Sequence, residues 1–356
     1  MRKELAKEIL EGSFISQGTM IAFPLCFPGA SAPIPADESH ITALDIAPDG
    51  TLHGGTSGRR VHIFAADFRG AKGAVFDMGT VEGANRCVAI CCGGDKFIAC
   101  LNGPEGGRVI RGKLGRLPYD LIQEWGFHRG EFEDLGEIVR GERILHAISD
   151  SSREEAIVLT EGHLASVEIE SGRIEVIGEI EGSGRLALGS KGDILGMDGA
   201  DSLWIYDPRD KTLTRRAIPL PKGSWGNHPL FWARDLIDGK LYTADDEGRL
   251  FSFTEDDGFS GSLGKIPFSP VGPMAVTFDG RLFGMCGAEM ANLFCYDPTD
   301  RSVTRLGVPV SVIERRRYGY VFGDAVLGPD GQIFFGEDDD LGHLWIYFPR
   351  ICHCRI

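Results

Sequence analysis

The chain has 356 residues, of which 42% are hydrophobic and 25% charged, a balance typical of a soluble globular protein with a buried core. Its apolar runs are far shorter than the roughly 18 to 20 residues of a membrane helix, so no membrane span is predicted. The net charge of −15 argues against sequence-independent binding of nucleic acid, which depends on a basic surface.

The N-terminal residues 1–12 predict a short amphipathic helix or arm. Acidic residues interrupt its apolar positions, so no secretory signal is predicted and the expected location is the cytoplasm. The cysteine content agrees with that location, because most of the nine cysteines lie inside apolar, strand-like runs. We therefore expect free, buried thiols rather than a disulfide framework at Cys87, Cys91, Cys92 and Cys100.

A repeated unit runs along the rest of the chain. It starts with a Gly-containing turn, continues with an apolar strand, and ends with a strand rich in aromatic residues. The turns have the glycine that a tight hairpin requires, and clear copies are Asp49-Gly50, Lys191-Gly192, Asp238-Gly239, Asp279-Gly280 and Asp330-Gly331. Successive turns lie roughly 40 to 60 residues apart, which is the period of a four-stranded propeller blade.

The second strand of the unit repeats as well, in Leu203–Pro208, Asn292–Pro298 and Leu344–Pro349. We therefore predict an all-β fold, a single seven-bladed β-propeller domain of four-stranded antiparallel blades over residues 1–356. The predicted blades span residues 41–80, 85–140, 142–181, 183–222, 226–268, 271–312 and 318–351. The last blade lacks a fourth strand, so residues 13–23 are expected to supply it and to close the ring between the N- and C-terminal segments.

Ligand sites of propellers lie where the innermost strands begin, on loops held by a rigid scaffold. The stretch 225–235 places an indole, an amide, an imidazole and a guanidinium near one such strand, from Trp225, Asn227, His228 and Arg234. Indole rings stack on sugar faces and arginine pairs with carboxylates, so the stretch is a candidate binding site. In the structural alternative, Trp232 belongs to the core and Arg234 pairs with Asp235 on the surface.

Two further stretches supply candidate site residues. Arg317, Tyr318 and Tyr320 follow a run of arginines and predict a local anion pocket, with a solvated charged loop as the alternative. His146 begins an inner strand, so it is predicted to face the channel as a base or ligand. The alternative for His146 is a core histidine with a satisfied hydrogen bond.

The metal content of the site is left open by the sequence. The acidic run 336–343 has the oxygen ligands that calcium prefers but lacks the alternating spacing of a calcium loop, so a solvated turn is the alternative. Cys352, His353 and Cys354, with Cys26, are a candidate zinc set without the usual Cys-x-x-Cys spacing. Calcium and zinc are therefore the two cofactors considered.

The residue pattern of the blades resembles that of seven-bladed propellers that act on uronic-acid-containing carbohydrates. The segments that carry the resemblance are 54–58, 232–235, 335–337 and 342–347. These include lyases of ulvan and rhamnose–glucuronate linkages and related propeller rhamnosidases. The resemblance implies a lyase that cleaves an acidic oligosaccharide or polysaccharide by β-elimination, with His, Tyr and Arg side chains at the channel mouth.

In that interpretation His228 or His146 removes the proton, Tyr318 or Tyr320 protonates the leaving group, and Arg234 or Arg317 neutralises the uronate. Trp225 and Asn227 would contact the sugar. One alternative is a propeller that binds a protein or a small ligand without turnover. The other is a metal-dependent hydrolase or lactonase.

Overall fold

The computed structural model describes residues 15–25, 33–68, 73–115, 130–150, 152–311 and 317–350. Within these ranges the chain is almost entirely β-strand, and the only helical element is the 3-10 turn η1 (Ala36–Glu38). No helix in the described ranges is long and apolar enough to cross a membrane. The predicted arm at 1–12, and the cysteines at 26, 352 and 354, lie outside the described residues.

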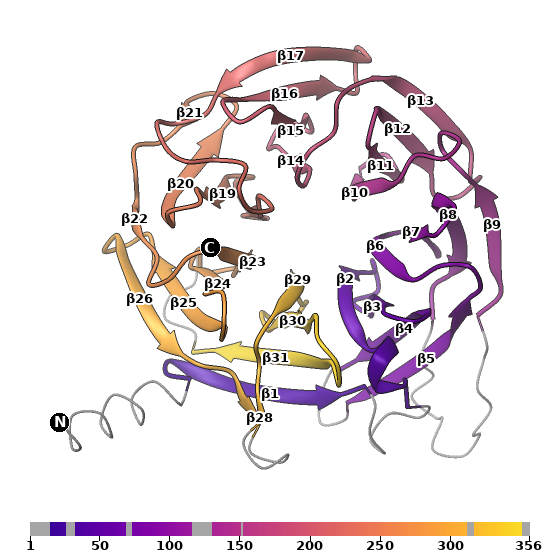
Figure 1. The fold of residues 1–356 in the computed structure, drawn as a ribbon. Coiled ribbons are helices and arrows are strands. Elements are labelled where there is room, and N and C mark those ends of the chain that lie inside the picture. The colour runs from indigo at the N-terminus through magenta and orange to yellow at the C-terminus, as the bar shows by residue number, and fades with distance from the viewer. Residues whose placement is uncertain are drawn as a thin grey trace.

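The strands form antiparallel sheets arranged around a common axis, as Figure 1 shows. The first sheet along the chain contains β2 (His40–Ile46), β3 (Leu52–Ser57), β4 (Val61–Asp67), β5 (Ala74–Val81), β6 (Arg86–Gly93), β7 (Lys96–Gly103), β8 (Gly106–Lys113) and β9 (Phe132–Gly136). Two four-stranded sheets follow, with strands β10 (Ile144–Asp150), β11 (Glu155–Thr160), β12 (His163–Glu168) and β13 (Ile174–Glu179), then β14 (Ala187–Leu188), β15 (Ile194–Asp198), β16 (Ser202–Asp207) and β17 (Thr212–Pro219).

The second half of the chain continues the same pattern. A five-stranded sheet contains β18 (Ala233–Arg234), β19 (Leu241–Ala244), β20 (Arg249–Thr254), β21 (Gly258–Phe259) and β22 (Gly264–Lys265). The next sheet contains β23 (Val271–Val276), β24 (Leu282–Cys286), β25 (Asn292–Asp297) and β26 (Ser302–Gly307), and a short ribbon joins β27 (Val310–Ser311) to β28 (Arg317–Tyr318). In each blade the first strand is innermost.

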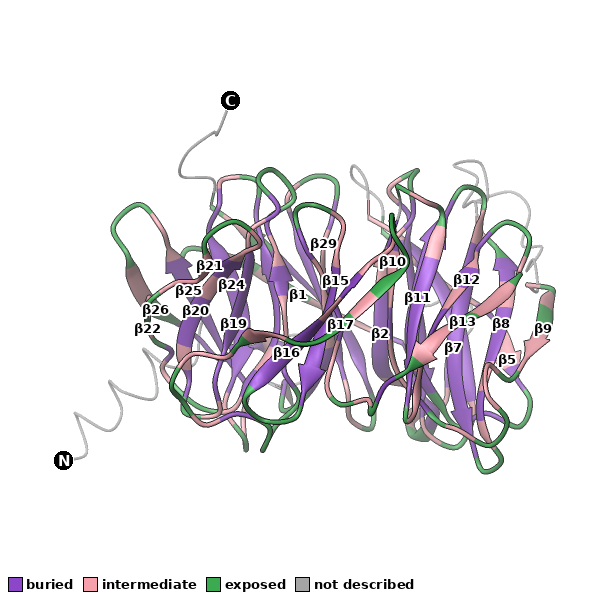
Figure 2. Cartoon of the chain, turned by 90° about the horizontal axis from the view of Figure 1, so that it is seen from above, coloured by how far each residue is buried: buried purple, intermediate pink, exposed green. Residues whose placement is uncertain are grey.

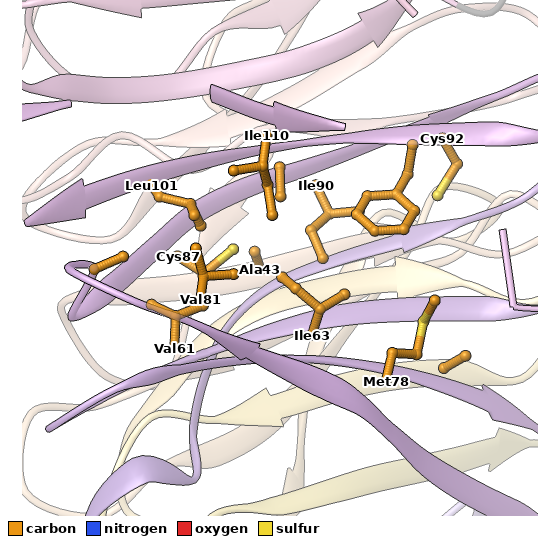
Figure 3. Close-up of a cluster of buried hydrophobic side chains, with 14 of the residues drawn as sticks. Ala43, Val61, Ile63, Met78, Val81, Cys87, Ile90, Cys92, Leu101 and Ile110 are labelled. Carbon is orange, nitrogen blue, oxygen red and sulfur yellow. The ribbon is translucent and has the colours of Figure 1, made fainter. Parts of the chain in front are cut away.

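Five blades stand as separate sheets of four or five strands, rather than the seven that the repeat predicted. The difference arises because β2–β9 form one eight-stranded sheet, in which the pair Ser57 and Arg86 links β3 to β6. The halves β2–β5 and β6–β9 also pack against each other through a buried apolar cluster (Figure 3), which includes Ile63 and Val81 from one half and Ile90 and Leu101 from the other.

The last sheet combines the two ends of the described chain. Its strands β29 (Phe322–Leu327), β30 (Ile333–Glu337) and β31 (His343–Pro349) come from the C-terminal part. The fourth strand is β1 (Gly18–Pro24), which pairs antiparallel with β31 along its whole length, from Gly18 opposite Pro349 to Pro24 opposite His343. The strand that completes this sheet therefore overlaps the segment 13–23 named from the sequence.

The glycine of the second strand in a blade makes room for an aromatic ring of the third. Gly54 lies opposite Phe64, Gly196 opposite Trp204, and Gly284 opposite Phe294. A Cβ atom added at any of these glycines would overlap the facing ring, and the three rings are fully buried. The repeat of glycine and aromatic positions in the sequence is thus a packing requirement of the blade.

The thiols pack in the same cores. Cys87, Cys91, Cys92 and Cys100 are free and buried, which confirms the expectation from their apolar surroundings.

We expect Gly196→Ala to lower the free energy of unfolding by about 1 to 3 kcal/mol, because the added methyl group forces Trp204 out of its position. Urea denaturation would measure the change. Gly178→Ala is the matched control, since its Cβ would meet only the Leu213 side chain at 3.6 Å. Equal transition midpoints for the two variants would contradict the packing argument.

Candidate functional site

The innermost strands surround the axis of the ring and begin at one face, which we call the N-face. Figure 1 shows β2, β6, β10, β14, β23 and β29 in this position, and β18 takes it in the remaining sheet, whose strand order begins with β18. Figure 2 shows that the buried residues fill the strands and that the exposed residues gather at the turns of the two faces. Side chains that point toward the axis, or lie on the loops of the N-face, are therefore the candidates for a site.

Arg185 lies just before β14 and reaches across the axis to β29, on the opposite side of the ring in Figure 1. Its Nη1 donates to Asp324 Oδ1 at 3.1 Å and its Nη2 donates to the Gly323 carbonyl at 2.5 Å. The face of the guanidinium lies 4.2 Å from the centre of the Phe231 ring. The side chains of Arg185 and Asp324 keep 20% and 21% of their exposure, so solvent or a ligand reaches the pair.

Asp45 lies near the end of β2, deeper along the axis. Its Oδ2 accepts the Cys92 backbone N–H at 2.7 Å and the Ser149 hydroxyl at 3.3 Å, and its Oδ1 accepts its neighbour's N–H at 2.9 Å. Burial raises the pKa of Asp45 from 3.8 to about 7, with a smaller contribution from the charge of Asp324. Burial raises the pKa of Asp324 as well, although Arg185 opposes the change.

His146 lies on the inner strand β10, close enough to Arg185 to feel its charge. Its Nδ1 accepts the Leu186 backbone N–H at 3.1 Å. Burial lowers the pKa of His146 well below its usual range, and the positive charge of Arg185 acts in the same direction. The ring is therefore neutral with its proton on Nε2, an arrangement that suits a hydrogen-bond donor better than a base.

A shallow depression on the N-face lies beside Arg185. Among the residues that line it are Trp225, His228, Phe231, Asp246 and Val271. Trp225 is nearly buried, donates from Nε1 to the Pro221 carbonyl at 2.9 Å and packs on Phe251. The His228 side chain is exposed. The Phe231 ring connects the depression to the channel, because the same ring carries the Arg185 guanidinium.

Asp246 holds the loop that presents His228. Its carboxylate accepts the backbone N–H groups of Asn227 at 3.2 Å and His228 at 3.1 Å, and the Asn227 side-chain amide at 2.9 Å. Asn227 therefore uses its side-chain N–H groups to fix the loop, and its contact with a sugar stays a prediction. Such an arrangement gives an exposed histidine a defined position.

Arg234 is not brought to this depression. It ends β18 at the far side of the strand from His228, where Glu255 and Asp150 are its electrostatic neighbours. Burial lowers its pKa, and its Nε has no hydrogen-bond partner among the described residues. Asp150 ends β10 and Glu255 follows the end of β20, so Arg234 lies toward the face of the ring opposite the loop that carries His228. Trp232 contributes to the buried clusters, packed on Phe259, as the structural alternative proposed.

Neither tyrosine is among the residues that line the depression. Tyr318 belongs to β28 and pairs with Val310 of β27, which contacts the edge strand β1 at the outer rim. Tyr320 is exposed on the loop that precedes β29. The side chain of Arg317 lies outside the described residues.

The acidic run 336–343 has a structural use. Glu337 is fully buried, and one of its oxygens accepts the His343 backbone N–H at 3.1 Å, His343 Nδ1 at 2.7 Å and Trp345 Nε1 at 3.1 Å. His40 contacts Asp338 at 3.4 Å and Asp340 at 2.9 Å. In the described ranges no group of three or more His, Cys, Asp and Glu side chains is arranged to hold a metal ion.

Sequence reasoning did not select Arg185, Asp45 or Asp324 for the site. A usable signal existed for Asp45, which interrupts the apolar segment Leu44–Ile46 of an inner strand. A carboxylate at such a position needs donors from another element, which points to the axis. No local pattern shows that Arg185 and Asp324, 139 residues apart, form an ion pair.

No family model and no curated protein matches the chain. Solved structures do match. A streptogramin B lyase has a TM-score of 0.64 at 13% identity and covers 93% of this chain and 97% of its own. Virginiamycin B lyase from Staphylococcus aureus has a TM-score of 0.64 at 10% identity, covering 92% and 98%. A chain in the mitotic checkpoint complex has a TM-score of 0.60 at 12% identity, covering 96% and 97%.

At these identities the likeness concerns the fold alone. The chain has the β-propeller fold that these proteins share, which confirms the propeller part of the sequence resemblance. The carbohydrate part stays a prediction.

We expect Asp45→Asn to change how stability depends on pH. The folded state binds the Asp45 proton more tightly than the unfolded state does. The contribution of Asp45 to the free energy of unfolding therefore falls as pH rises from about 4 to about 7. The variant lacks this loss, and its free energy of unfolding relative to the wild type should rise between pH 4 and pH 8. Urea denaturation across that range measures the difference. The exposed Asp256→Asn should show no such trend.

Proposed function

We propose that the N-face of the channel binds a small organic acid and that the protein is a lyase that acts on it by β-elimination. The observation that carries the proposal is the shared position of Phe231. Phe231 is one of the residues that line the depression with His228, and the Arg185 Cζ lies over its ring, 4.2 Å from the ring centre. A substrate in the depression would contact an imidazole and a guanidinium together.

Each of these groups has a role in an elimination. Arg185 would bind the carboxylate of the substrate, which makes the neighbouring C–H bond more acidic. His228 would accept the proton, since no described residue forms a hydrogen bond with its ring. The electron pair of the C–H bond then forms the new C=C bond, and the leaving oxygen or nitrogen departs and takes a proton from water.

The substrate class includes the uronate-containing oligosaccharides that the sequence resemblance implies. Two of the similar structures are lyases by name, and another is a catalytically inactive histidine-to-alanine variant of virginiamycin B lyase with quinupristin. These neighbours support elimination as the type of reaction, with either an acidic sugar or another carboxylate as substrate. We assign the role of the cation to Arg185 in place of Arg234 or Arg317.

We also infer that the ring is a seven-bladed propeller closed by the two ends of the chain. The halves β2–β5 and β6–β9 each have the strand order of a blade, and only one residue pair joins them. Their buried faces pack against each other as neighbouring blades do. The pairing of β1 with β31 then supplies the closure.

A second candidate function is binding without turnover. The observation that favours it is that the polar groups of the channel already have partners within the protein. Asp45, Asp324 and His146 all accept backbone N–H groups, which is the pattern of a structural network. In that case the depression would hold a ligand beside Arg185 with no proton transfer.

His228→Gln should lower turnover by about two to four orders of magnitude, the usual contribution of a general base, while substrate affinity changes little. The assay incubates the protein with uronate oligosaccharides and other carboxylates that carry a leaving group, and follows the ultraviolet absorbance of the new double bond.

His163→Gln is the matched control, because that histidine also lies on the N-face but is bonded to Glu142. If the wild-type protein binds these acids but never forms the double bond, the lyase proposal is wrong and the binding function takes its place. Full activity of His228→Gln would remove that residue from the mechanism.

A further inference from the structure

Exposed hydrophobic side chains are distributed unevenly over the N-face. Phe268, Tyr320, Val321 and Leu341 keep 42%, 43%, 47% and 38% of their exposure. They lie on the loops that precede β23 and β29 and on the turn between β30 and β31. The described loops that precede β2, β6, β10 and β14 expose no large hydrophobic residue. We call these four residues the apolar sector.

Two loops of the apolar sector lead along the chain to the depression and to the Arg185 contact. Phe268 is followed by Pro270 and Val271, which line the depression. Val321 is held by its carbonyl, which accepts the Asp338 N–H at 2.9 Å, and it precedes the Gly323 carbonyl that receives Arg185. This side of the channel mouth therefore exposes apolar side chains close to a cation, beside the acidic turn that contains Asp338 and Asp340.

We propose that the ligand of this site is an amphipathic organic acid, whose carboxylate binds Arg185 and whose apolar body covers the apolar sector. The inference rests on the proposed function, because it places the ligand at the same mouth. Exposed apolar groups gathered in one area mark a binding surface. A guanidinium recessed to 20% exposure on the channel axis suits a small carboxylate better than the flat surface of a protein partner.

Asp324 gives the site an internal competitor. Its carboxylate already pairs with Arg185 and is fixed by the backbone N–H groups of Leu44 at 2.9 Å and Ala325 at 3.0 Å. The Arg185 guanidinium has five N–H donors in all, and a ligand carboxylate must share them with Asp324. A short, purely polar acid gains too little from that shared contact, so the apolar body is needed for affinity.

Isothermal titration calorimetry with three probes tests the proposal. The probes are 4-phenylbutyrate, its amide, and acetate, and none of them needs to react. We expect 4-phenylbutyrate to bind at least tenfold more tightly than either the amide or acetate. The double variant Tyr320→Ser with Val321→Ser should weaken 4-phenylbutyrate binding by roughly tenfold, because it removes apolar contact area. Arg185→Met should remove the preference for the acid over the amide.

Ile21→Ser with Phe348→Ser is the matched control, since these side chains have 45% and 39% exposure but lie on the β1–β31 pair. It should leave binding unchanged. Equal affinity for acetate and 4-phenylbutyrate, or equal weakening by the control pair, would overturn the inference. Should Arg185→Met fail to fold, the amide comparison and the surface variants decide. If the protein shows this binding preference but catalyses no elimination, the lyase proposal is rejected and the inference about the ligand stands.

Discussion

The inner edge of every blade presents backbone N–H groups that no other strand of that blade accepts, and the ring depends on how they are satisfied. Side chains of the neighbouring blades supply the acceptors. Asp324 accepts the N–H of Leu44, Asp45 accepts that of Cys92, and His146 accepts that of Leu186. Each of these bonds links one inner strand to the segment at the next inner strand, so the first role of these polar groups is to hold the inner strands together.

This requirement explains why titratable groups gather where water is scarce. A carboxylate that caps an inner-strand N–H is drawn into the channel, where burial raises its pKa, as at Asp45. Perturbed groups of this kind are also what active sites contain, so the same observation supports either a structural or a chemical use. The position of Arg185 separates the two uses, because its contacts cross the axis and stack on Phe231, a residue of the open depression.

The sequence predicted features with a local cause. Asp279-Gly280 marks the turn between β23 and β24 because a tight hairpin needs glycine there, and its φ is 85° at Gly280. It did not predict that Arg234 and His228 lie toward opposite faces of the ring, because β18 has only two residues and leaves no alternating pattern in the sequence. The ribbon of β27 and β28, which places Tyr318 at the outer rim, also has strands of only two residues. Arg185 and Asp324 could not be paired at all, because their contact depends on the diameter of the ring.

The two sides of the N-face are built differently, and this difference decides where a ligand can lie. Over β2–β5, the fully buried Glu38 accepts Arg60 Nε at 2.9 Å and lies 2.8 Å from His62 Nε2, while His62 Nδ1 lies 2.9 Å from Asp77. The charges on that side are therefore used within the protein, and a ligand would have to break ion pairs to bind there. Over β23 and β29 the exposed residues include Phe268, Tyr320 and Val321, and a ligand that covers these apolar side chains breaks no ion pair of theirs. A ligand that carries an acid is thus directed to the side of the mouth where Arg185 meets Phe231.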